Sequence, residues 1–188
     1  MIRGEAPLSI VIDGATALAT AVSDSVACVR LEPDPAAQWW AVNDEVMGGI
    51  SSGSIEREPG GTLVFAGAVS FENNGGFASV RRATGSLTAF DAFRLVLLGD
   101  GKRYKLTAYA EGGMSGFAYQ APFATRAGHR DTVDLALAAF RPTFRGREVR
   151  DAPALTPDRI RAVGLLISDK QGGTFRLEVG AIDLLKRG

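Results

Sequence analysis

The stretch TLVFAGAVSFENNGGFASVRR, residues 62–82, indicates the fold class, because its pattern of short strands and turns recurs along the rest of the chain. Residues 62–71 and 77–82 are short runs rich in apolar, β-branched and aromatic residues, which is the composition of strands. Between them, residues 73–76 read Asn-Asn-Gly-Gly, and these residue types tolerate the positive φ angles that tight turns need. The stretch is therefore predicted to form a β-hairpin.

The same pattern of short strands and glycine-rich turns runs through most of the chain. We expect a second hairpin from residues 93–98 and 103–110, single strands at 117–123 and 132–137, and a final pair from 162–168 and 174–184. Residues 140–157 contain three prolines among four arginines and predict a long basic surface loop. Residues 156–160 predict one helical turn, because Thr156 can cap it and Pro157 suits its first position. The count is about eight to ten strands with little helix, which predicts an all-β jelly-roll sandwich in a single domain over residues 1–188.

Composition excludes several functional classes. Of the 188 residues, 21 are Lys or Arg and 21 are Asp or Glu, so there is no net charge to attract nucleic acid. No run is long and apolar enough for a membrane span, and the N-terminus lacks the pattern of a signal peptide. Cys28 is the only cysteine, which suits a reducing compartment, and its apolar neighbours predict a buried side chain. We therefore expect a cytoplasmic protein, with peripheral association with a membrane complex left open.

Residues that commonly perform catalysis are sparse. His129 is the only histidine, in a turn-like segment without the nucleophile or ligands of a triad or zinc site. Acidic residues beside Gly and Asn leave two alternatives open, a two-carboxylate glycoside hydrolase and a structural calcium site. The acidic residues available for either are Asp44, Glu45, Glu72, Asp100 and Glu111. Such residues more often form turns, so we predict no enzyme, no metal and no cofactor.

Two segments have the chemistry of a binding surface. Residues 39–52 combine two tryptophans and a methionine with Asn, Asp and a Gly-Gly pair, so apolar area, hydrogen-bonding groups and accessible backbone amides occur together. Residues 73–82 combine a polar turn with two arginines. A structural interpretation is equally open, in which Trp39 anchors the core, Asn43 and Asp44 form an Asx turn, and the arginines are solvated.

These motifs, taken in order, resemble the complex I intermediate-associated protein 30 family. The resemblance rests on WxxVNDxVMGGxS at residues 39–51 and NNGGFASVR at residues 73–81. It continues through GDGKRY at 99–104, YQAxF at 119–123, FRP at 140–142, and two segments at 160–169 and 173–177, and covers about residues 37–185. It implies a jelly roll of the galactose-binding-domain-like type, with no family catalytic residues. Mitochondrial members are assembly chaperones for NADH:ubiquinone oxidoreductase, so the resemblance implies a protein partner such as respiratory-complex subunits or assembly intermediates.

Three functions are thus open, in order of preference. The first is a protein-binding assembly factor, whose contact face is formed by the two segments and the arginine-bearing loop around Arg145. The second is a small-ligand module, with carbohydrate as the favoured ligand, and the third is the hydrolase. The candidate binding residues are Trp39, Asn43, Asp44, Met47, Gly48, Gly49, Ser51, Asn73, Asn74, Gly75, Gly76 and Arg81.

Overall fold

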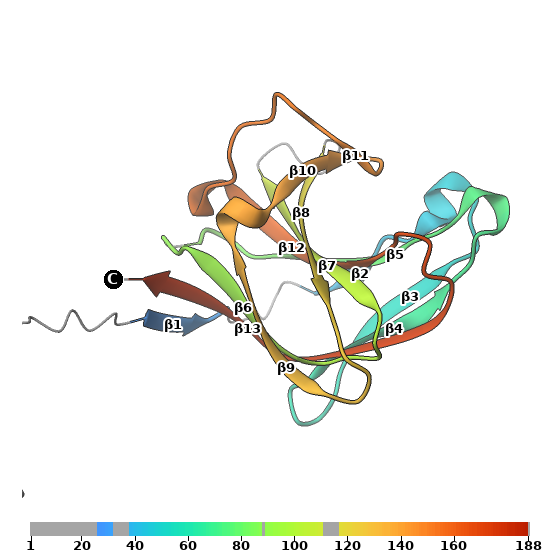
Figure 1. Ribbon diagram of the computed structural model, residues 1–188, viewed down its shortest axis with the longest axis horizontal. Helices are drawn as coiled ribbons and strands as arrows, with labels where there is room; N and C mark the ends of the chain where they lie inside the picture. Colours follow the sequence, from blue (N-terminus) through green and yellow to red (C-terminus); the bar gives the residue numbers. More distant parts are fainter. Residues whose placement is uncertain (1–25, 32–37, 88, 111–116, 188) are drawn as a thin grey trace, which may run out of the picture.

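The computed structural model describes residues 26–31, 38–87, 89–110 and 117–187. In this part of the chain two antiparallel sheets face each other and form a sandwich (Figure 1). The predicted all-β jelly-roll fold is confirmed. The described residues form thirteen strands, more than the eight to ten expected, because several strands have only two to five residues.

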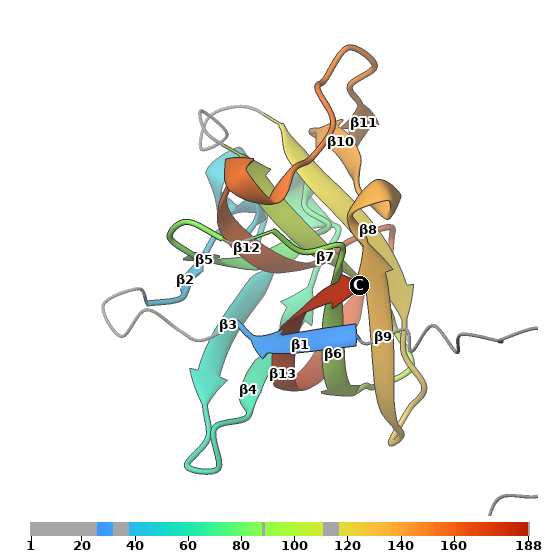
Figure 2. The ribbon, with the colours of Figure 1, turned by 90° about the vertical axis from the view of Figure 1, so that its left-hand side faces the viewer.

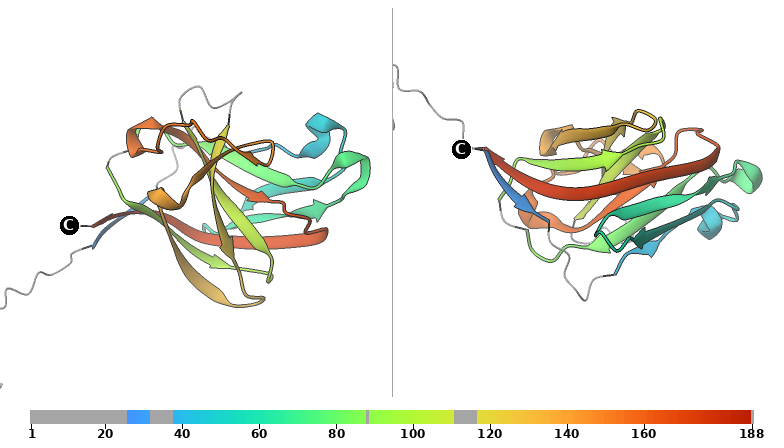
Figure 3. Two further views of the ribbon diagram at one scale, coloured as in Figure 1. Left: turned by 45° about the horizontal axis from the view of Figure 1, so that its top comes forward. Right: turned by 90° about the horizontal axis from the view of Figure 1, so that it is seen from below.

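The first sheet has the order β3-β4-β13-β6-β9, with β1 also paired to β13. Its strands are β1 (Val26–Arg30), β3 (Ser52–Arg57), β4 (Leu63–Val69), β6 (Ala92–Leu98), β9 (Arg130–Ala136) and β13 (Gly173–Arg187). The long strand β13 curves along the whole sheet and joins its two halves (Figure 3). Its register against β6 shifts between Val179 and Ala181, so Gly180 is the extra residue of a β-bulge.

The second sheet has the order β11-β10-β8-β7-β12-β5-β2. Its strands are β2 (Trp40–Ala41), β5 (Ala78–Ala83), β7 (Arg103–Ala110), β8 (Ala118–Ala124), β10 (Arg141–Phe144), β11 (Arg147–Glu148) and β12 (Ile160–Ile167). Four single turns of 3-10 helix lie in the connections: η1 (Asp44–Met47), η2 (Glu72–Asn74), η3 (Leu137–Ala139) and η4 (Pro157–Arg159). None of the described helices is long and apolar enough to cross a membrane.

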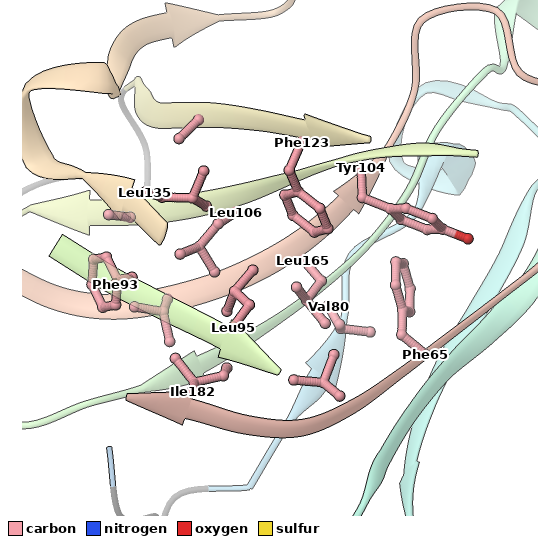
Figure 4. Packing of buried hydrophobic residues seen from close by; sticks show 14 of the residues in the cluster. Phe65, Val80, Phe93, Leu95, Tyr104, Leu106, Phe123, Leu135, Leu165 and Ile182 are labelled. Carbon is pink, nitrogen blue, oxygen red and sulfur yellow. The ribbon is translucent and has the colours of Figure 1, made fainter. Parts of the chain in front are cut away.

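The hydrophobic core lies between the sheets, because alternate residues of each strand point inward. In β7, for example, Tyr104 and Leu106 are fully buried and belong to the core cluster. Aromatic rings from both sheets meet there, with the ring centroids of Phe65 and Phe175 4.8 Å apart and those of Phe65 and Tyr104 6.4 Å apart (Figure 4). Edge-to-face and tilted contacts of this kind stabilise the core beyond the burial of apolar area.

The predicted hairpins are wrong, although the predicted strands are present. Strand β4 pairs with β3 and β13, whereas β5 pairs with β2 and β12, so residues 70–77 cross from one sheet to the other. The pairs β6 with β7 and β12 with β13 are divided between the sheets in the same way. Turn residues specify a local reversal of the chain but not which sheet the next strand joins.

Two smaller predictions also need correction. Residues 140–157 are not one irregular loop, because β10 and β11 pair within them. Cys28 is exposed rather than buried, since β1 has β13 as its one strand partner at the margin of the sheet. The predicted helical turn is present as η4 with Pro157 as its first residue, but Thr156, at the N-cap position, makes no capping hydrogen bond through its side chain.

Candidate functional site

The two segments singled out in the sequence meet at one end of the sandwich. Residues 42–51 run from β2 in the second sheet to β3 in the first, and residues 70–77 run back from β4 to β5. The two crossing connections lie side by side, with η1 and η2 as neighbouring coils (Figure 1, right; Figure 3). We call residues 43–51 and 70–77 together the tip.

The side chain of Asp44 joins the two halves of the tip. It is fully buried, and its Oδ1 accepts a hydrogen bond from the amide of Ser51 at 2.9 Å. Its Oδ2 accepts from the amides of Gly76 at 2.7 Å and Phe77 at 3.3 Å. A chain that leaves one sheet for another takes its backbone amides out of the ladder, and buried amides need another acceptor. The carboxylate of Asp44 supplies that acceptor for both crossings.

These hydrogen bonds also set the charge of Asp44. Burial by itself raises the pKa of a carboxyl group, because it removes water from the charged form. Hydrogen bonds from the Ser51 side chain and from the amides of Gly76, Ser51 and Phe77 outweigh that effect, so the pKa of Asp44 lies below its usual value. Asp44 is therefore a charged structural group at neutral pH, with its oxygens already occupied.

Glycines of the motif leave the space that this carboxylate fills. A Cβ added at Gly49 would lie 2.3 Å from Oδ1 of Asp44, and one at Gly75 would lie 2.7 Å from Oδ2. Both distances are far inside van der Waals contact, so neither position accepts a larger residue without displacing Asp44. Gly48 serves a different purpose: it ends η1 in the left-handed region with φ of 89°, where glycine is favoured.

Asn43 connects the two sheets next to Asp44, and Ser51 joins the connections that flank β3 and β4. Asn43 accepts a hydrogen bond from the amide of Ser79 in β5 at 3.3 Å and donates one to the carbonyl of Gly53 in β3 at 3.2 Å. The hydroxyl of Ser51 accepts from the amide of Ser70 at 3.0 Å and lies 3.2 Å from its carbonyl oxygen. Six of the predicted binding residues thus have a structural role in holding the tip, namely Asn43, Asp44, Gly49, Ser51, Gly75 and Gly76.

The outer surface of the tip is formed by other residues. Ile50 is 53% exposed and Phe71 is 52% exposed, and among the described residues they are two of the three large hydrophobic side chains with such exposure. Ile50 directly precedes Ser51 and Phe71 directly follows Ser70, and these two serines are hydrogen-bonded to each other, so both exposed side chains belong to the same part of the tip. Asn73 and Asn74 are exposed beside them, in the left-handed region with φ of 54° and 62°. Gly76, with φ of 142°, completes this turn, and Met47 lies in η1.

Sequence reasoning missed Ile50 and Phe71. A signal was present in the sequence, because each is an apolar residue beside polar ones. Ile50 comes directly before Ser51, and Phe71 is the last residue of the predicted strand at residues 62–71. The first motif leaves position 50 unspecified, and Phe71 lies just before the second motif, which begins at Asn73.

Trp39 lies outside the tip. Its ring is partly buried against the core, and it lines a hollow of about 110 Å³ together with Arg30, Arg57 and Arg82. The indole Nε1 of Trp39 is buried and has no hydrogen-bond partner among the described residues. The walls of the hollow come from β1, β3, β4 and β13 of the first sheet and from β5 and β12 of the second, and they include the bulge residue Gly180.

Arg81 also lies apart from the tip, on β5. It pairs in register with Trp40 of β2, and its guanidinium carbon lies 4.4 Å from the ring centroid of Tyr109 in β7. This is cation–π distance, so Arg81 binds its own sheet. The predicted residues therefore separate into the structural interior of the tip, its exposed surface, and two positions elsewhere.

The residues considered for catalysis or metal binding are divided among the described residues: Asp44, Glu45 and Glu72 belong to the tip, whereas Asp100 and His129 lie outside it. His129 is exposed and its Nδ1 lies 2.9 Å from the carbonyl oxygen of Ala127. Asp100 accepts hydrogen bonds from the Tyr104 hydroxyl and from the amides of Lys102 and Arg176. Glu111 lies outside the described residues, and within them no three His, Cys, Asp or Glu side chains are grouped as metal ligands would be.

Comparisons with known proteins agree with this architecture. The family model described as complex I intermediate-associated protein 30 (CIA30) matches residues 31–179. A search of curated proteins gave no match. Among solved structures, the chain is similar to a family 11 carbohydrate-binding module from Clostridium thermocellum in complex with a β-1,3-1,4-mixed-linked tetrasaccharide. The TM-score is 0.58 at 12% identity, over 85% of this chain and 95% of that one. A family 29 carbohydrate-binding module gives a TM-score of 0.52 at 8% identity, over 86% and 89% of the chains. At these identities the likeness concerns the fold alone.

Proposed function

We propose that this chain, which belongs to the complex I intermediate-associated protein 30 family, is a non-catalytic binding domain of the assembly-factor type. Its partner would be a protein, and the family description points to subunits or assembly intermediates of NADH:ubiquinone oxidoreductase or another membrane-associated complex. The tip would be its contact surface.

One observation carries this proposal: Ile50 and Phe71 both stand exposed on a tip that hydrogen bonds hold in place. Burying a large apolar side chain completely contributes about 1.5–3 kcal/mol. Each of these side chains is about half exposed, so covering both on a partner would contribute about 2–3 kcal/mol. That is about a 30- to 150-fold gain in affinity, which suits an interface with a small apolar centre and a polar rim of Asn73 and Asn74.

The interior of the tip supports the same role. Loops that must be ordered on binding lose conformational entropy, and a preorganised surface avoids most of that cost. Asp44 and Asn43 fix both crossing connections before any partner arrives. The motif would then serve binding indirectly, by holding Ile50 and Phe71 in place.

Quantitative co-purification from the native cells tests the proposal. The I50S/F71S variant keeps Asp44 and Asn43 and should fold normally, while losing most of the associated proteins. T132S/A136S, which changes two exposed residues of β9 by small amounts, is the matched control and should retain them. The proposal fails if the tip variant and the control recover the same proteins in the same amounts, or if wild type recovers no reproducible partner.

The hollow beside Trp39 favours a second candidate, a small-ligand module for a carbohydrate. The buried indole N–H of Trp39, which has no partner among the described residues, could donate to a hydroxyl group, and a module of similar fold is known in complex with a tetrasaccharide. Titration calorimetry with the β-1,3-1,4-linked tetrasaccharide tests this candidate. Binding heat that is reduced in W39F would support it, and the absence of heat with wild type would exclude this ligand.

A further inference from the structure

The hairpin of β10 and β11 extends from the edge of the second sheet, away from the tip. β11 is the outermost strand, and β10 pairs with β8 through residues 141–143 only. The hairpin therefore projects beyond its neighbouring strand, at the top of the molecule in Figures 1 and 2. We call residues 141–151 the arm.

The turn of the arm has an unusual residue for its conformation. Phe144 pairs with Arg147, and the two residues between them, Arg145 and Gly146, both have positive φ, 48° and 77°. This is the geometry of a two-residue type I′ turn, whose first position favours Asn, Asp or Gly. An arginine gains nothing there from the local backbone, so its place in the turn of the arm needs an explanation outside the fold.

Positive charge on the arm is not neutralised within the protein. Arg141, Arg145, Arg147 and Arg150 are all exposed, and none forms an ion pair with a carboxylate among the described residues. Arg141 donates to the carbonyl of Ala138 at 2.7 Å. By contrast, Arg30, Arg94, Arg126 and Arg176 each pair with an Asp or Glu. In a chain with no net charge, the arm is thus a local concentration of available guanidinium groups.

An aromatic ring accompanies these groups. Phe144 is 45% exposed, the third large hydrophobic side chain with such exposure among the described residues. The guanidinium carbon of Arg145 lies 5.4 Å from its ring centroid, within cation–π distance. Arginine and aromatic residues are enriched at the centres of protein interfaces, where one supplies bidentate hydrogen bonds to carboxylates and the other apolar area.

We propose that the arm is a second contact surface, and that it binds an acidic segment of a protein partner. Carboxylates of that segment pair with Arg145 and Arg147, and an apolar side chain of the segment covers Phe144. This inference rests on one premise of the proposed function, namely that the domain binds a protein. It uses residues separate from the tip.

The arrangement of charge favours a protein over a membrane surface. The arm carries four arginines, but Glu148 and Asp151 follow directly after Arg147 and Arg150, so its net charge is only +2. A uniformly anionic bilayer would attract this net charge weakly, and one exposed aromatic ring is a poor second anchor. A folded partner can place each carboxylate opposite one guanidinium and avoid the interleaved acidic groups.

A photoreactive amino acid at position 148, in the full chain expressed in the native cells, tests the inference. Position 132 on the exposed face of β9 is the control. We expect a cross-link from 148, absent from 132, whose partner peptide carries Asp or Glu near the linked residue. In the R145E/R147E background its yield should fall at least about tenfold, because two attractive pairs become repulsive. In R145K/R147K, which keeps the charge but loses the planar fork, the yield should fall only about two- to fivefold.

Every other result counts against the arm. No cross-link above that of position 132, an unchanged yield after charge reversal, or linked peptides without acidic residues would each overturn the inference. Flotation of the wild-type protein with phosphatidylserine-containing vesicles, but not with phosphatidylcholine vesicles, and its loss in R145E/R147E, would replace the protein partner with a lipid surface. If position 148 gives no cross-link in a protein with an otherwise unchanged arm, while I50S/F71S still impairs co-purification, the arm is refuted and the proposed function stands.

Discussion

Replacing Asp44 with Asn should destabilise the protein strongly, although the substitution only exchanges one carboxylate oxygen for an NH₂ group. Asn has one acceptor oxygen, whereas Asp44 uses two, one for Ser51 and one for Gly76 and Phe77. If the Asn oxygen faces Gly76 and Phe77, its NH₂ group faces the amide of Ser51, donor against donor. One buried amide is then unsatisfied, at a cost of about 1–3 kcal/mol, and the remaining bonds lose their charge assistance. Together these effects reduce the free energy of unfolding by about 2–4 kcal/mol.

Urea denaturation followed by tryptophan fluorescence measures this loss, with D151N as a control because Asp151 is exposed. The corresponding fall in Tm is about 5–15 °C. Since the folded-state pKa of Asp44 is lowered, its contribution is complete above the unfolded-state value of about 4 and is lost as the pH falls through the lower folded-state pKa. The gap between wild type and D44N should therefore narrow in acid. A loss below about 0.5 kcal/mol at neutral pH, or a gap that stays constant on acidification, would refute the assigned role of Asp44.

Three further predictions follow from particular contacts. G49A should reduce the free energy of unfolding by about 2–4 kcal/mol, because its Cβ would overlap the carboxylate of Asp44. The control G60A has open space around the added Cβ and should change the free energy of unfolding by less than about 0.5 kcal/mol. Equal effects of the two variants in urea denaturation would contradict the packing around Gly49. Y104F removes the 2.9 Å hydrogen bond to Asp100 and should cost about 1 kcal/mol in the same assay, while an unchanged midpoint would mean that the bond contributes nothing. Cys28 should react with a water-soluble thiol reagent in the native protein about as fast as after unfolding, and slow native labelling would show that β1 shields it.

The strands of this fold could be predicted from the sequence, and their partners could not. Alternation of apolar residues identified β5, β7 and β8 closely, because the period of two reports one buried face. The alternation of apolar residues does not indicate which sheet a strand joins. The turn at residues 73–76 does use left-handed Asn and Gly residues as predicted, but it leads from β4 to the opposite sheet. What holds that crossing is Asp44, a residue about thirty positions earlier in the chain, and a long-range contact of this kind leaves no local pattern.

The candidate site shows the same division. Sequence motifs located the tip but assigned binding to its interior, since Asn43 and Asp44 have the hydrogen-bonding groups expected of a ligand site. Their burial against backbone amides became evident only in three dimensions. The exposed residues, Ile50 and Phe71, have no distinctive chemistry in one dimension. Cys28 was misplaced for a related reason, because an apolar run looks alike at the margin and at the centre of a sheet.

The central claim is that the tip contacts a protein partner through Ile50 and Phe71, and cross-linking from position 71 tests it most directly. A photoreactive phenylalanine analogue at this position keeps the aromatic ring and leaves Asp44 in place, and position 132 on β9 again serves as the control. The account predicts a cross-link from 71 to a defined protein, absent from 132 and reduced about three- to tenfold when Ile50 is also changed to Ser. A position 71 that cross-links no better than position 132 in the native cells would contradict it.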